Sequence, residues 1–100
     1  MITIINPMLI KPGQMDEFVN LQRSFVLSMS GQLAGLLGGR MYCNAEGTKA
    51  LLLSHFESAE AQAATTRMPD FQAHLAKVRA MVEASSPDQY AEAYTYGRFS

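Results

Sequence analysis

The 100-residue chain contains no tryptophan, a single cysteine, and basic residues that never stand next to one another. The lone cysteine, Cys43, cannot form an internal disulfide, and no second cysteine or His-x-His spacing offers a structural zinc site. The net charge is -1, from eight basic and nine acidic residues. Without a basic cluster, neither nucleic acid nor anionic lipid is expected as a partner.

Long hydrophobic runs are also missing. The N-terminal run ITIINPMLI, residues 2–10, is far shorter than the ~20 residues of a membrane span, and neither a basic segment before it nor a small-residue cleavage site after it marks a signal peptide. We therefore expect a mature cytoplasmic protein with one domain over residues 1–100 and no membrane association. A domain of this length buries only roughly 60–65% of its unfolded surface, which favours oligomerisation.

Hydrophobic periodicity divides the chain into alternating strands and helices. Residues 2–10 are apolar on both alternating faces, which predicts a strand covered on both sides, and Lys11-Pro12-Gly13 ends it. Residues 14–30 carry an apolar stripe at helical spacing. The expected elements are a strand over 2–10, a helix over 14–30, a glycine-rich loop over 30–39, a hairpin over 40–56 that turns at Glu46-Gly47, a helix over 58–84 with Ser58 as N-cap and an interruption at Pro69, and a last strand over 89–99.

This βαββαβ order predicts an α+β fold, a ferredoxin-like sandwich whose antiparallel sheet carries both helices on one face. The other face would meet water in a monomer. Leu51 and Leu53 nevertheless alternate with Leu52, so this strand is apolar on both sides. We therefore expect a second copy of the chain to cover the open face, sheet against sheet, in a homodimer.

Several segments resemble the antibiotic biosynthesis monooxygenase family in their order and spacing. They are the Asn-Pro pair of the first strand, KPGQMDEFVNLQRSF, GGRMYCN, LLLSHFESAEAQAA, MPDFQAHLAKV and SPDQYAEAY. The resemblance covers nearly the whole chain and implies a dimeric α/β barrel with a pocket in each subunit between helices and sheet. Some members of the family oxidise aromatic polyketide intermediates with O2 and no metal or flavin. Others degrade haem, isomerise small metabolites, or have no known activity.

Asn6 is the unusual residue of the first strand, because alternation places its amide on the same face as Ile4 and Met8. Two interpretations stay open. If this face looks toward the helices, the resemblance places the amide in the ligand pocket, where it can orient a phenol and stabilise developing phenolate charge. Alternatively, Asn6 satisfies a backbone group freed by Pro7, which has no N–H.

His74 is the second catalytic candidate. It lies near the apolar stripe of the second helical piece, where an imidazole with a pKa near ~6.5 could take a phenolic proton. The alternative is a boundary histidine with one nitrogen in water. In haem-degrading relatives an asparagine, a tryptophan and a histidine form the site. Asn6 and, with about a one-residue offset, His74 occupy comparable places, but the missing tryptophan argues against haem degradation.

The remaining polar and apolar candidates rank lower. The proposed substrate contacts are Arg40, Tyr42, Met8, Phe25 and Phe71. His55 fits a structural role better than a catalytic one, and Cys43 is expected to be a buried, inert thiol. The stripe of Tyr90, Tyr94 and Tyr96 is typical of packing at an interface.

The expected function is that of a cofactor-independent monooxygenase acting on a small aromatic molecule such as a quinol or anthrone. The sequence has no dinucleotide fingerprint, phosphate loop or metal triad, so we expect no metal and no cofactor, and the substrate must supply its own electrons. Two alternatives remain: a haem-binding or haem-degrading protein, and a non-catalytic dimeric module that binds a small molecule.

Overall fold

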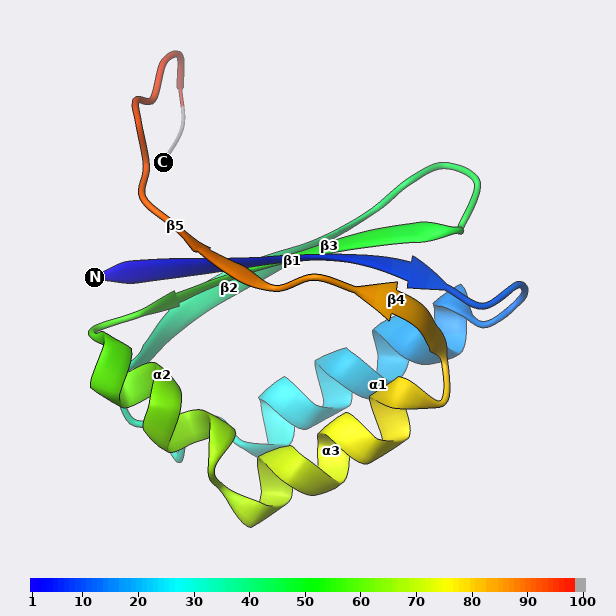
Figure 1. Ribbon diagram of the computed structural model, residues 1–100, viewed down its shortest axis with the longest axis horizontal. Coiled ribbons are helices and arrows are strands. Elements are labelled where there is room, and N and C mark those ends of the chain that lie inside the picture. Colours follow the sequence, from blue (N-terminus) through cyan, green and yellow to red (C-terminus); the bar gives the residue numbers. More distant parts are fainter. Residues whose placement is uncertain (99–100) are drawn as a thin grey trace.

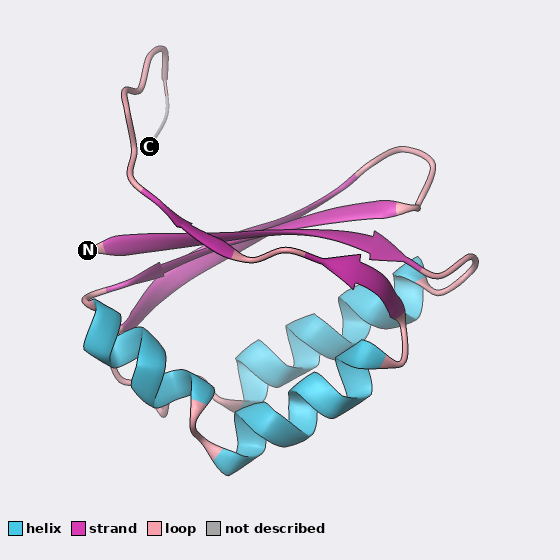
Figure 2. Cartoon of the chain, viewed as in Figure 1, coloured by secondary structure: helices cyan, strands magenta, loops and turns pink. Residues whose placement is uncertain are grey.

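The computed structural model describes residues 1–98, which form one antiparallel sheet with the helices gathered on a single face (Figure 1). The elements are β1 (Ile2–Ile10), α1 (Met15–Ser28), β2 (Leu36–Cys43), β3 (Lys49–Phe56), α2 (Ala59–Thr66), α3 (Pro69–Arg79), β4 (Val82–Ser85) and β5 (Asp88–Tyr90). The strand order is β2-β3-β1-β4, and β5 pairs with β1 as well. Figure 2 shows the two layers, sheet and helices, and confirms the predicted ferredoxin-like α+β fold.

The central strand, β1, pairs with β3 along almost its whole length, with Asn6 opposite Leu52. On its other edge, β4 pairs with the end of β1 and β5 with its beginning. The break between these two short strands lies opposite Asn6 and Pro7, where proline has no N–H to donate. The carbonyl of Pro7 still accepts the N–H of Ser86 at 3.3 Å.

The core lies between the sheet and the helices α1 and α3. Phe18 of α1 is fully buried, and Met8 and Ile10 of β1 are only 4% and 3% exposed. These two β1 side chains belong to the face predicted to carry Ile2, Ile4, Met8 and Ile10. Since residues of a strand alternate between faces, Asn6 lies on the same helix-facing side.

Local signals at the ends of the helices are confirmed. The Ser58 hydroxyl accepts the backbone N–H of Ala61 at 3.1 Å, as an N-cap should, and Pro69 occupies the first turn of α3. Gly35 takes a φ of +85° just before β2, where a Cβ would come within 2.4 Å of the Ala61 Cβ. Glycine is therefore required at this position by both conformation and space.

Three boundaries differ from the sequence-based expectation. β2 begins at Leu36 rather than at residue 40, because the glycines of this segment still pair with β3. The helix predicted up to residue 84 ends at Arg79, and Val82 instead starts β4 opposite Ile10. The last strand predicted over 89–99 is shorter: β5 ends at Tyr90, residues 91–98 are not in a strand, and Phe99 lies outside the described residues.

Among the described residues, no helix has both the length and the apolar character needed to cross a membrane.

Candidate functional site

The Asn6 amide oxygen is the most unusual polar atom of the layer between sheet and helices. Within residues 1–98, Oδ1 of Asn6 is the one buried side-chain nitrogen or oxygen that lacks a hydrogen-bond partner. Leaving a buried amide oxygen unpaired costs about 1–3 kcal/mol. The oxygen therefore does not satisfy a backbone group near Pro7, which was the alternative interpretation. It is a buried acceptor with unused capacity.

His74 forms a second feature, where α3 packs against α1. Its imidazole is 7% exposed and lies parallel to the ring of Phe25, with ring centroids 4.1 Å apart and an interplanar angle of 9°. Phe71 meets the same phenyl ring edge-on, at 6.0 Å and 63°. The structure thus brings together three of the predicted site residues, Phe25, Phe71 and His74, in one aromatic cluster between two helices.

The hydrogen bonding of His74 defines its tautomer. Nε2 of His74 lies 2.5 Å from Oε1 of Gln22, an amide oxygen that can only accept, so Nε2 carries the proton. In the neutral ring the lone pair is then on Nδ1. Because Asn6 Oδ1 is the only buried and unpartnered side-chain polar atom in the described chain, Nδ1 of His74 keeps some contact with solvent.

Burial lowers the pKa of His74 from its usual 6.5, because the charged ring would be desolvated, and the nearby positive charge of Lys77 lowers it further. The imidazole is therefore neutral at pH 7. A neutral imidazole with a solvent-accessible Nδ1 is able to accept a proton.

A groove of about 570 Å³ runs between α1 and α3 and gives access to this histidine. Its apolar lining includes Leu21, Phe25 and Met29, and its polar lining includes Asp70 and Lys77 along with His74. Asn6 is not part of this lining. The candidate base on α3 therefore lines the groove, whereas the acceptor on β1 does not. A ligand that contacted both would have to extend from the groove toward the sheet.

The opposite, outer face of the sheet carries a different set of the predicted contacts. Met41 pairs with Leu52, which pairs with Asn6, so Arg40 and Tyr42 alternate to the other face of the sheet. Within one subunit these two side chains do not share a pocket with the Asn6 amide. Met8 lies on the Asn6 side of β1.

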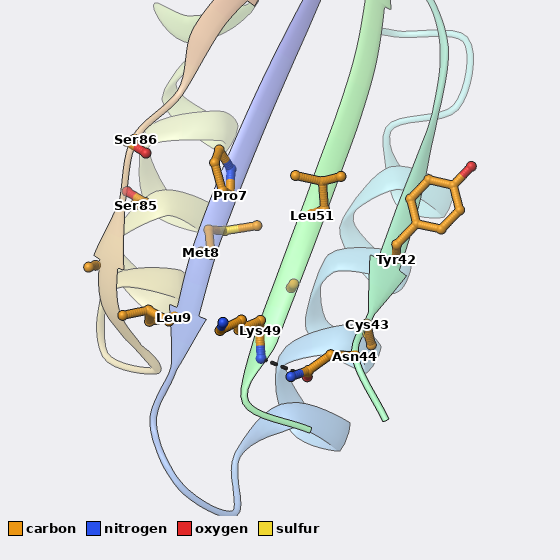
Figure 3. A pocket seen from close by; sticks show the side chains of 12 residues that line it. Pro7, Met8, Leu9, Tyr42, Cys43, Asn44, Lys49, Leu51, Ser85 and Ser86 are labelled. Carbon is orange, nitrogen blue, oxygen red and sulfur yellow. Dashed lines mark hydrogen bonds between the residues drawn. The ribbon is translucent and has the colours of Figure 1, made fainter. Parts of the chain in front are cut away.

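The outer face is hollowed at one end, in a cavity of about 680 Å³ that we call the outer hollow (Figure 3). Its lining includes Pro7, Leu9, Tyr42, Cys43, Lys49 and Leu51. The lining comes from the end of β1, the start of β3, the end of β2 and β4. It is predominantly apolar, with the Lys49 amine as its charged group.

The structure also places four lower-ranked residues. His55 Nδ1 is 2.9 Å from the Thr3 hydroxyl on the neighbouring strand, a cross-strand contact that supports the structural role predicted for it. Cys43 was expected to be buried, and this was wrong: it is exposed, because it ends β2 at the edge of the sheet. Tyr94 and Tyr96 stand beyond the end of β5 and are 78% and 80% exposed.

Sequence reasoning missed Gln22 as a functional partner. It was counted among the apolar stripe of α1, although it bonds the His74 ring. A polar residue within an apolar stripe is itself a signal, because an amide that is partly buried there needs a partner. Among the described residues, no cluster of three or more His, Cys, Asp or Glu side chains is placed to hold a metal ion.

Comparison with known proteins identifies relatives of this chain. Residues 1–77 match the family model described as antibiotic biosynthesis monooxygenase. Among solved structures, SnoaB of Streptomyces nogalater, a cofactor-independent oxygenase, superposes with a TM-score of 0.82 at 15% identity, over 94% of each chain. PA3566 of Pseudomonas aeruginosa gives a TM-score of 0.77 at 15% identity, over 93% of this chain and 94% of that one. A conserved protein of Methanosarcina mazei gives 0.78 at 16% identity, over 89% of each. Among curated proteins, none gives a significant match.

Proposed function

The chain belongs to the antibiotic biosynthesis monooxygenase family. On that premise we propose that it is a cofactor-independent monooxygenase, which uses O2 to oxidise a small aromatic substrate such as a quinol or an anthrone. SnoaB, which has the same fold, is a cofactor-independent oxygenase. At 15% identity this likeness supports the fold alone, so the proposal depends on the site itself.

The observation that carries the proposal is the unpaired Oδ1 of Asn6. A buried amide oxygen without a partner is a costly feature that most proteins avoid, and it is typical of a binding site rather than of a core. The chemical complement of this oxygen is a donor, such as the hydroxyl of a phenol or of the enol form of an anthrone. The amide nitrogen of the same side chain can then donate to an oxygen that becomes negatively charged.

His74 is the proposed base. Its neutral ring keeps Nε2–H directed at Gln22, which leaves Nδ1 to take the proton from the substrate. The stacked Phe25 holds the ring in place. Removing the proton converts the substrate into an electron-rich anion, which can pass an electron to O2 without help from a second reductant.

The overall reaction balances for an anthrone. The CH2 carbon loses both hydrogens and gains one atom of O2 as a carbonyl oxygen, and the second oxygen atom leaves with the two hydrogens as water. The four electrons that reduce O2 all come from that carbon. The protein has to remove a proton, stabilise charge and exclude water, and it needs no bound cofactor for these tasks.

We also propose that the functional unit is a homodimer formed through the outer face of the sheet. Three large side chains of this face are substantially exposed: Leu9 at 43%, Leu51 at 37% and Tyr42 at 49%. A contiguous exposed patch of this kind marks an interaction surface. A second copy of the same face would cover it with self-complementary symmetry.

The test is aerobic incubation of chelator-treated protein with a panel of anthrones and hydroquinones, with O2 uptake as the readout. We expect uptake above that of heat-inactivated protein for at least one substrate, and loss of that uptake in Asn6→Leu. Asn20→Leu, the same chemical change on the exposed face of α1, should retain it. Uptake that never exceeds the inactivated control, or that is unchanged in Asn6→Leu, would contradict the proposal.

A further inference from the structure

The helix layer covers the two halves of β1 unequally. At the end of the strand, Met8 and Ile10 are only 4% and 3% exposed and belong to the same core cluster as Phe18 of α1. Toward its beginning, Ile4 and Asn6 lie on the same helix-facing side but are only half-buried. Part of each of these two side chains is therefore within reach of a small molecule from solvent.

Two further polar side chains flank Ile4 on this side of the sheet. Ser54 of β3 and Gln89 of β5 pair directly with Ile4, one from each neighbouring strand (Figure 1). Residues that are paired in this way point to the same face of the sheet. With strands about 4.8 Å apart, Ser54 and Gln89 stand roughly 10 Å from one another across Ile4. Asn6 is two residues further along β1, about 7 Å from Ile4 at ~3.3 Å per residue.

These three polar side chains have unused hydrogen-bonding capacity. Within residues 1–98, the hydroxyl of Ser54 and the side-chain amide of Gln89 have no hydrogen-bond partner. Oδ1 of Asn6 is buried without one, whereas the Asn6 amide nitrogen and the Ser54 hydroxyl keep some contact with solvent. Gly39, which pairs with Ser54 on β2, has no side chain that could cover the hydroxyl. The three groups are therefore available to a ligand.

The polar groups around Ile4 are all uncharged. The two cross-strand rows that contain them on the helix-facing side are Gly39-Ser54-Ile4-Gln89 and Met41-Leu52-Asn6. A carboxylate or phosphate on a ligand is typically held by arginine or lysine, and neither row contains one. Hydroxyl and amide side chains can both donate and accept, so they suit the hydroxyl or carbonyl oxygens of a neutral ligand.

We propose that Ser54 and Gln89 bind a second oxygen of the substrate, para to the oxygen that Asn6 holds; we call this pair the second-oxygen site. The inference rests on the proposed function and narrows its substrate to a para-dihydroxy aromatic molecule. The ring lies along β1 between Asn6 and Ile4. Its far hydroxyl lies over Ile4, between the Ser54 hydroxyl and the Gln89 amide. A ring with one oxygen, or with two adjacent oxygens, does not reach this pair.

Anaerobic NMR titration of the full chain tests the second-oxygen site, because excluding O2 separates binding from oxidation. The probes are hydroquinone, catechol and phenol, which share one ring and differ only in the number and position of their hydroxyl groups. Hydroquinone should bind at least about fivefold more tightly than either of the others, which is the net value of about one hydrogen bond. Its binding should shift the backbone amide signals of Ile4, Ser54 and Gln89.

Variants of the two residues should remove this preference. Ser54→Ala and Gln89→Ala should each reduce the preference for hydroquinone over phenol by at least about threefold, and the double variant should bind the three probes alike. Phenol affinity should stay within about twofold throughout, which also shows that the site is still folded. Ser86→Ala is the matched control, because it makes the same change beside the outer hollow and should retain the preference (Figure 3).

Equal affinity for the three probes, or a preference for hydroquinone that survives in the double variant, would overturn the second-oxygen site. Shifted signals confined to the groove between α1 and α3, or to the outer face of the sheet, would overturn it too. The oxygenase proposal would then still be decided by O2 uptake and its loss in Asn6→Leu. A protein that prefers hydroquinone through Ser54 and Gln89 but consumes no O2 would retain the second-oxygen site and contradict the oxygenase proposal.

Discussion

Replacing Asn6 by leucine should make the protein more stable and less active at the same time. In the free protein the buried Oδ1 of Asn6 has no partner, so the folded state carries a desolvation cost of about 1–3 kcal/mol. Leucine has a similar volume and no polar atom. Its neighbours on this side of the sheet, Ile4, Met8 and Leu52, are apolar, so it exchanges an unpaired amide for apolar contact.

We expect the free energy of unfolding of Asn6→Leu to rise by about 1–2 kcal/mol, which corresponds to roughly 4–16 °C in Tm for a domain of this size. Urea unfolding of both proteins at the same protein concentration measures the difference, because the apparent stability of a dimer depends on protomer concentration. Binding sites commonly lower the stability of the folded protein, because the groups that function requires are not the ones that stabilise the fold best.

Asn20→Leu is the control for this experiment, because Asn20 is exposed on α1. The same change of side chain there should alter stability by no more than about 0.5 kcal/mol, mainly through helix propensity. If Asn6→Leu is no more stable than wild type, or less stable, the amide has a partner that offsets its burial, and the reasoning from Asn6 to a binding site is refuted.

Three further predictions follow from the described contacts. Gly35→Ala should destabilise the protein by about 2–4 kcal/mol, because the position has a positive φ and the added Cβ clashes with Ala61. Gly31→Ala, at φ +79° in open space, should show only the smaller conformational cost, and equal losses of stability in thermal unfolding would contradict the clash. Burial lowers the pKa of His74, so its contribution to stability is complete above pH 6.5 and is lost as the pH falls through the lower pKa of the folded state. His74→Gln should therefore reduce the fall of the urea unfolding midpoint below pH 6.5, and an unchanged pH profile would argue against a buried neutral ring. Leu51→Glu should shift sedimentation toward a monomer, because it places a carboxylate in the apolar outer face, and a dimer of unchanged affinity would place the interface elsewhere.

The fold was predictable from the sequence because its signals are local and repeated. The alternation in β1, the stripe of α1, the cap at Ser58 and the proline at position 69 each depend on a few neighbouring residues. β4 was missed because Val82 continues the helical apolar spacing of α3. Its pairing with Ile10, a contact distant in sequence, decides its conformation.

The site was only partly predictable. The face of Asn6 follows from strand alternation, but its lack of a partner depends on every group packed around it, which spacing does not show. The Gln22–His74 bond joins residues 52 positions apart on two helices. Arg40 and Tyr42 were predicted as substrate contacts because they share one face of a strand and carry a cation and a phenol, but the register places that face opposite to Asn6.

The measurement that tests the central claim most directly is turnover under 18O2 with chelator-treated protein and a substrate found in the panel. The account predicts that the product gains one labelled oxygen atom per turnover, that the second atom appears in water, and that Asn6→Leu gives only the uncatalysed background. Recovery of the consumed O2 as hydrogen peroxide with no label in the product, or conversion that appears only after a metal or flavin is added, would contradict it.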